Sequence, residues 1–550
     1  MSNDLFKKVP VKVQSRSGFD KSYRNLLTTK VGTLTPLVCD ELIPNTTVNM
    51  KLAISAQLPP LATDTFMKCR LRTEAFFCPT RLLMKGYEDW LTGNDVINST
   101  NKSYVTTPVV RLSQKFAQPG SLADYLGFMV RSSPKPSADT NYGVSAFPFL
   151  AYHMIWDDWY RNSLIQKSLF ADAKNAIGGK AIQYGPDSIK FVVPSTSSGY
   201  EIFAESQFAN SHKFGDLHQR NFGMDYFTTA TPRPQNGAAQ GLKMKVEGKL
   251  GAAGSQADLN TGFSIAALRA ANSMQLFLER NNLAGNRLVD YVKAHYGATL
   301  SDGVAQRSVY LGGASFDVYS KGIYQSGSGA STVSVNNPFK TVGARYGSAY
   351  AEGADFVINN FTAMEPGYIM VLVSLVPDVT YSSGIKRSLM HFVEPQSQSD
   401  MANPLLQNVG NQPIYLYELD ASFGEISPND SIFGYTDRFA EYKYNNDELH
   451  GLLRDGGTLS AFALQRNFGE SADASQQFDI SSEFLEIPTD YLDQVSAVKG
   501  DVSNYGVWID SFVDLKEVMP LARYAIPTLE DPAYEHGQTV MLDRSGRHVD

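Results

Sequence analysis

One short apolar run near the middle of the chain most restricts the possible folds. Residues Tyr368 to Val376 are almost continuously apolar, and the turn signal Glu365-Pro366-Gly367 and the stop signal Pro377-Asp378 enclose them. The run is too short to cross a bilayer, which takes ~20 apolar residues. A strand without polar alternation is buried on both faces, so it needs a layer of structure on each side. The sequence therefore predicts a large, layered, mainly β protein.

The overall charge limits which partners the surface can bind. The chain has 550 residues and a net charge of −8, which argues against a surface that binds nucleic acid everywhere. The first thirty residues are locally basic, with Lys7, Lys8, Lys12 and Arg16 as the leading cations. Such a segment is either an arm that contacts phosphates or a solvated tail. Spacing alone favours the solvated tail.

Alternating apolar and polar residues predict further strands. Val48–Leu58 and Phe66–Phe77 both alternate with a period of two. The second segment places Lys68, Arg70 and Arg72 on one face, where they meet either an anionic partner or water; water is the favoured reading. Further strands are expected at residues 189–193, 354–358, 414–419, 439–444 and 506–512.

Long connections and helices interrupt the predicted strands. Residues 93–147 have the composition of a surface excursion, and residues 151–300 form a mixed insert. Tyr152–Phe170 has partly helical spacing, and its adjacent Asp157 and Asp158 form a candidate carboxylate pair. Adjacent residues on a helix point about 100° apart, so the two would not converge on one substrate atom. A solvated acidic edge is therefore the favoured interpretation. Two helices are expected at Ser264–Asn282 and at Asn286–Tyr296, the second ending at Gly297.

No sequence motif of catalysis or of cofactor binding is found. Phosphate-binding loops, HExxH, GxSxG, EF-hand loops and CxxC pairs are absent. His212 and His218 are the closest histidines but have no third ligand at metal spacing, so no metal ligand is assigned. The three cysteines predict free thiols in a reducing compartment, and neither a signal peptide nor a membrane span is expected. Scattered carboxylates and aromatic residues leave open a β-sandwich protein that binds or cleaves carbohydrate.

Several motifs together resemble the major capsid protein of the Microviridae, in particular its gokushovirus-like branch. Each motif is weak alone, and their order along the chain makes the resemblance specific. They are found at residues 18–24, 32–36, 39–44, 76–83, 159–161, 225–228, 232–237, 268–271, 278–280, 310–313, 365–369, 375–381, 433–444 and 523–527.

The resemblance implies a non-enzymatic structural protein with an eight-stranded antiparallel jelly roll and long loop and helical insertions, all in a single domain over residues 1–550. Copies would assemble in the bacterial cytoplasm into a T=1 icosahedral shell around circular single-stranded DNA. Implied partners are further copies of the chain, the genome on the inner surface, a small basic DNA-binding phage protein and a host receptor, with no membrane and no cofactor. Lys7, Lys8, Lys12 and Arg16 would then face the DNA. A three-fold protrusion would be small or would come from residues 93–147.

Overall fold

The computed structural model describes most of the chain. The described residues are 9–13, 16–63, 65–84, 87–92, 107–111, 118–128, 143–170, 191–192, 201–203, 212–236, 265–285, 287–325, 345–391, 403, 407, 410–421, 432–466, 468, 480–497, 506–521 and 538–542.

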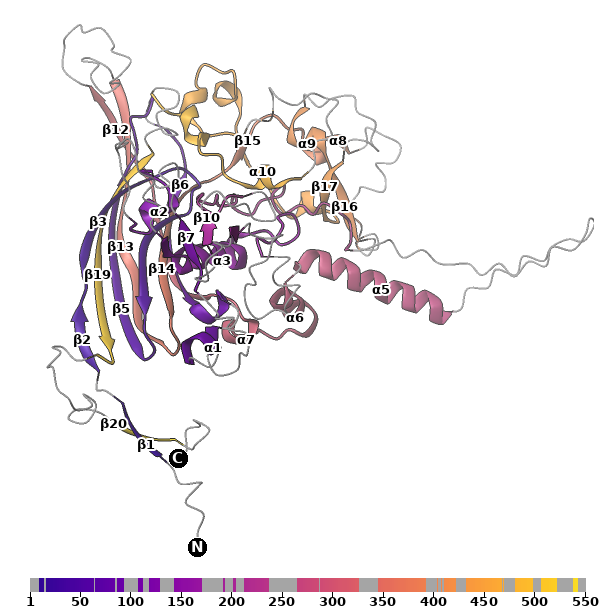
Figure 1. The fold of residues 1–550 in the computed structure, drawn as a ribbon. Coiled ribbons are helices and arrows are strands. Elements are labelled where there is room, and N and C mark those ends of the chain that lie inside the picture. The colour runs from indigo at the N-terminus through magenta and orange to yellow at the C-terminus, as the bar shows by residue number, and fades with distance from the viewer. Residues whose placement is uncertain are drawn as a thin grey trace, which may run out of the picture.

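Two antiparallel sheets form a β-sandwich (Figure 1). The first sheet has the strand order β11-β6-β14-β4, with bounds Val309–Asp317, Cys69–Pro79, Gly367–Pro377 and Thr35–Leu42. The second has the order β12-β13-β5-β19-β2, with β3 also on β19, and bounds Tyr319–Gln325, Arg345–Ala363, Thr46–Gln57, Val507–Met519, Ser17–Asp20 and Tyr23–Thr29. The antiparallel sandwich is confirmed. The two sheets of the sandwich have four and six strands among the described residues, so a jelly roll of eight strands stays a prediction.

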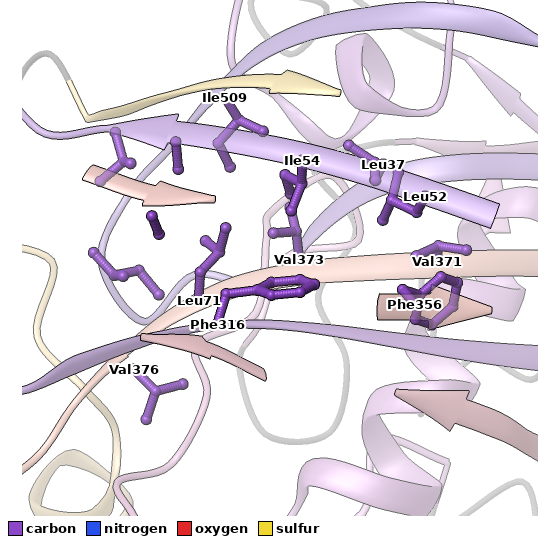
Figure 2. Close-up of a cluster of buried hydrophobic side chains, with 14 of the residues drawn as sticks. Leu37, Leu52, Ile54, Leu71, Phe316, Phe356, Val371, Val373, Val376 and Ile509 are labelled. Carbon is purple, nitrogen blue, oxygen red and sulfur yellow. The ribbon is translucent and has the colours of Figure 1, made fainter. Parts of the chain in front are cut away.

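Strand β14 is buried along its whole length, as its apolar run predicts. It pairs with β6 on one side and β4 on the other, so its backbone polar groups are satisfied by two neighbours. Val371 and Val373 point into the core between the sheets, where Leu52 and Ile54 of β5 face them (Figure 2). Gly353 of β13 belongs to the same core, because a Cβ atom there would lie only 1.9 Å from the Phe316 ring.

The opposite face of β14 belongs to a second core. Tyr368, Met370 and Leu372 pack there with buried side chains of α3 (Phe147–Ile155), which lies against β6 and β14. A single turn of π-helix, Trp156–Tyr160, continues α3 and ends at Arg161. The predicted helix over Tyr152–Phe170 is therefore confirmed only for its first part.

A third hydrophobic cluster lies away from the sandwich and contains short elements of the C-terminal half (Figure 1). These are β16 (Asn411–Tyr415), α9 (Leu416–Leu419), β17 (Ile432–Asp437) and α10 (Ser482–Leu485). Of residues 414–419, expected as one strand, the first two are strand and the last four are helix. The strand expected at 439–444 is wrong, because Phe439 has φ 63° and Ala440–Tyr442 form a 3-10 turn.

The two predicted helices are confirmed. Helix α5 spans Ile265–Ala284, and α6 spans Leu288–Tyr296 and ends at Gly297, whose φ of 69° is the left-handed conformation that glycine tolerates. Helix α5 extends away from the sandwich (Figure 1). The remaining elements are short: β1 Val9–Val13, η2 Thr80–Leu82, α1 Tyr87–Thr92, β7 Val109–Arg111, α2 Leu122–Tyr125, β8 Gly143–Ser145, β9 Phe191–Val192, β10 Glu201–Phe203, α7 Asp302–Ala305, β15 Thr380–Tyr381, α8 Arg387–Met390, β18 Asp447–Glu448, η10 Gly451–Leu453, η11 Ser460–Phe462, η12 Tyr491–Gln494 and β20 Gln538–Leu542.

The three cysteines are free, with Cys69 and Cys78 buried and Cys39 partly buried. Burial raises the pKa of the Cys39 thiol to about 12, so this side chain is a neutral packing group at neutral pH. Among the helices that the structure describes, none combines the length and the apolar character that a bilayer crossing requires.

A buried ionic group lies beside the third cluster. Glu418 accepts hydrogen bonds from the Tyr226 hydroxyl at 2.9 Å and from the Tyr415 backbone N–H at 3.0 Å. Arg387 lies between two carboxylates, 3.7 Å from Glu418 and 3.9 Å from Glu441. Burial raises the pKa of Glu418 to about 7, although the Arg387 charge opposes the shift.

Replacing Val371 by Asp should prevent folding of the subunit, because an unpaired carboxylate would enter the core between the sheets at a cost of several kcal/mol. The measurement is the yield of soluble chain together with its circular dichroism. Ala53→Asp on the exposed face of β5 is the matched control and should fold. Soluble, folded but unassembled Val371→Asp subunits would contradict the assignment of β14 to a sealed core.

Replacing Glu418 by Gln should change how stability depends on pH. The folded pKa lies above the unfolded value, so the folded state takes up a proton, and this contribution is lost as pH rises from about 4.5 through 7. We expect the natural chain to lose about 1–3 kcal/mol of stability from Glu418 between pH 5 and pH 8, and the Gln variant to lose less. Urea unfolding at both pH values measures this, with Glu88→Gln as the exposed control. Equal pH dependence in the natural chain and Glu418→Gln would refute it.

Candidate nucleic-acid interface and assembly surfaces

The N-terminal arm leaves the sandwich at the corner where β2 pairs with the end of β19. Lys7 and Lys8 lie outside the described residues. Lys12 lies in β1, which pairs with β20 outside the sandwich (Figure 1). Arg16 is exposed and donates hydrogen bonds to the Val518 carbonyl oxygen at 3.0 Å and to the Thr47 hydroxyl. Arg16 therefore anchors the base of the arm, and a DNA contact by any of these four residues stays a prediction.

The next cations of the basic segment have carboxylate partners within the chain. Lys21 pairs with Asp40 and, at 3.3 Å, with Glu517. Arg24 donates from Nε to Asp510 at 2.8 Å. These pairs place the Lys21 and Arg24 cations of the segment beside carboxylates of the same chain.

The predicted row of cations on β6 and just before it lies next to carboxylates of the same chain. Arg70 pairs with Asp378, and Lys68 lies 3.5 Å from Asp447. At the inner end of the row, Glu74 accepts two hydrogen bonds from Arg220, at 2.6 and 3.1 Å. The expectation of a solvated face is confirmed for Lys68, which is exposed, whereas Arg70 and Glu74 also lie beside partners from other segments.

Asp157 and Asp158 diverge as expected, but the prediction of a solvated edge was wrong, since both are buried. Asp157 accepts hydrogen bonds from the Ser168 hydroxyl at 2.9 Å and the Leu169 N–H at 3.0 Å. Asp158 accepts from the Ser308 N–H at 3.0 Å. Each carboxylate joins the π-turn to a different segment, so the pair is structural and does not converge on one substrate atom.

Helix α5 presents apolar side chains outward. Leu268, Leu276 and Leu283 are 51%, 55% and 57% exposed. At 100° per residue they lie within a sector of about 80° on one side of the helix. Buried Asn282 anchors the C-terminal end of the helix, donating to Thr231 at 3.0 Å and to the Arg233 carbonyl oxygen at 2.7 Å.

Helical spacing in the sequence also predicts a second apolar side for this helix, formed by Ala267, Ala271, Met274, Phe277 and Leu278. Met274 and Phe277 remain 46% and 38% exposed, so this side is not covered by the core of the subunit. Phe277 contacts the His295 ring of α6 at a centroid distance of 5.0 Å. Both sides of α5 therefore leave apolar area that the subunit does not bury.

The outer face of the six-stranded sheet also carries exposed apolar residues, including Leu26 at 65% and Phe512 at 52%. An open groove of about 1180 Å³ follows β3 of this sheet and is lined in part by Tyr23, Tyr125 and Trp508. Apolar patches of this kind mark contact surfaces in monomers.

Three histidines meet beside α3. His153 of α3 joins His212 and His218, the pair that the sequence singled out, and one ring nitrogen of each lies within 4.8 Å of the others. Burial lowers the pKa of His153 to about 3 and the pKa of His218 well below its ordinary value, so these rings are neutral at pH 7. Sequence spacing could not identify His153 because it lies far from the other two in the chain.

Comparison with known proteins supports a structural role. The model of the capsid protein (F protein) family matches residues 7–262 and 252–529. Capsid protein VP1 of Chlamydia phage 1 is 25% identical, covering 95% of this chain and 97% of the relative. Capsid protein VP1 of Bdellovibrio phage phiMH2K is 24% identical with the same coverage, and that of Spiroplasma virus 4 is 23% identical, covering 94% and 95%.

The family match spans nearly the whole chain, including the sandwich, the insert with α5 and the third cluster. A family of structural capsid proteins gives no support to the alternative of a carbohydrate-binding or carbohydrate-cleaving protein. The exposed apolar residues of α5 agree with a structural subunit that binds other copies. The buried Asp157 and Asp158, whose hydrogen bonds join segments of the chain, agree with a structural role as well. The chain belongs to the capsid protein (F protein) family of phages.

Proposed function

We propose that copies of this chain, each a single domain with insertions, close into a T=1 icosahedral shell around a circular single-stranded DNA genome. The observation that carries the proposal is the contrast between a sealed sandwich and outward apolar residues on α5. More than half of each side chain of Leu268, Leu276 and Leu283 is left exposed by the subunit, and a neighbouring copy can bury these side chains. Closed symmetry requires each such patch to meet a defined complementary patch.

The arm is proposed to lie on the inner surface of the shell, where Lys7, Lys8, Lys12 and Arg16 contact the genome. Arg16 supports this as the anchor that fixes where the arm leaves the sheet. The neutralised cations Lys21 and Arg24 support it by leaving the arm as the local basic segment. Assembly in the bacterial cytoplasm, a small basic DNA-binding phage protein and a host receptor complete the proposal by family likeness.

Replacing Lys7, Lys8 and Lys12 together by Ala should weaken genome retention while leaving the shell intact. Each lost phosphate contact should lower the slope of log affinity against log salt by about 0.7 for single-stranded DNA. DNA content per particle, measured across a salt series, tests this, and Lys51→Ala on the outer face of β5 is the control. Unchanged DNA content and salt sensitivity would remove the arm from the DNA interface.

Replacing Leu276 and Leu283 together by Glu should block assembly without unfolding the subunit. Burying one leucine contributes ~1.5–3 kcal/mol, so losing two per contact should lower shell yield at least tenfold. A sizing column separates particles from subunits, and thermal unfolding checks the fold. Ser273→Glu adds charge to the side of α5 that already carries Arg269 and Arg280, and serves as the matched control. Full shell yield from the double variant would exclude this leucine stripe from the interface.

A further inference from the structure

We propose that His153, His212 and His218 form a binding site for a divalent transition-metal ion, with zinc as the reference ion. This goes beyond the proposed role in the shell and does not depend on it. Imidazole nitrogens are common ligands of zinc, copper, nickel and cobalt, and three of them converge here from two segments of the chain.

The hydrogen bonds of two of these rings set the tautomer that a metal ligand needs. His153 Nε2 lies 2.8 Å from the Phe214 carbonyl oxygen, and His212 Nε2 lies 3.3 Å from the Asp216 carbonyl oxygen. A carbonyl only accepts, so each Nε2 carries the proton and each Nδ1 is the unprotonated nitrogen. Metal-bound histidines typically donate their second N–H to a backbone carbonyl in this way.

The third ring already faces the first. His153 Nδ1 and His218 Nε2 are 2.8 Å apart and share one proton. Two nitrogens bound to one tetrahedral zinc at ~2.0–2.1 Å stand roughly 3.3 Å apart. An ion would therefore replace the shared proton and separate the two rings by about 0.5 Å, and His218 would carry its proton on Nδ1 instead. No net proton is released by this exchange.

The surrounding residues hold His153 and His218 in place, whereas His212 has room to move. His218 stacks on Trp156 with ring centroids 4.3 Å apart, and its backbone N–H donates to the Tyr152 hydroxyl at 2.8 Å. The His212 ring stacks on the His218 ring with centroids 3.9 Å apart, and His212 is only partly buried. Parallel rings do not aim their nitrogens at one point, so His212 must turn about its side-chain torsions to complete the site. Its partly exposed position also provides a route for the ion, and water would fill the fourth position.

The same cluster could instead be a neutral packing group without a ligand, and metal titration separates the two. The full-length chain is treated with EDTA, dialysed and titrated with Co²⁺ and then Zn²⁺. We expect about one Zn²⁺ per subunit by elemental analysis, a cobalt d–d absorption band that Zn²⁺ removes, and a melting temperature that rises with Zn²⁺. His212→Gln should weaken binding at least about 100-fold while melting normally without metal. His450→Gln, on an exposed histidine, is the matched control and should bind like the natural chain.

A natural chain that takes up no cobalt, or a His212→Gln variant that binds as tightly as the natural chain, would overturn the site. Should His212→Gln fail to fold, zinc X-ray absorption of the natural chain decides. Three imidazole ligands at ~2.0–2.1 Å support the site, and a shell of oxygen ligands alone contradicts it.

Discussion

The structure depends on one strand that can tolerate water on neither face. β14 pairs with β6 and β4 in its sheet, and its alternate side chains enter two different cores. One core exists because a second sheet covers Val371 and Val373, and the other exists because α3 and its π-turn cover Met370 and Leu372. The segment around α3 is therefore part of the hydrophobic core, and the four-stranded sheet depends on it to cover one face of β14.

The sequence was informative wherever the signal is local. The unbroken apolar run of β14, the alternation of β5 and the glycine that ends α6 all predict elements that the structure contains. It failed where partners come from far along the chain. In the sequence Asp157 and Asp158 resemble surface residues, but in the structure they are buried and accept hydrogen bonds from Ser168 and Ser308. Phe439 lies in an aromatic segment typical of a strand, yet its backbone is left-handed.

The candidate sites follow the same division. The basic composition of the arm is visible in the sequence, but the pairing of Lys21 and Arg24 with distant carboxylates is not. His212 and His218 could be paired by spacing, whereas His153 joins them only because α3 packs beside their loop. The ion pairs of Lys21, Arg24 and Arg70 lie within the chain. The proposed contacts between copies therefore rest on the apolar area that α5 and the outer sheet face leave exposed.

The central claim is that this chain closes on copies of itself. The most direct measurement is the mass and shape of the purified full-length chain, by mass photometry together with negative-stain imaging. A T=1 shell of 60.5 kDa chains should appear as round particles of about 3.6 MDa. A stable monomer of 60.5 kDa at all concentrations and salt conditions would contradict the account.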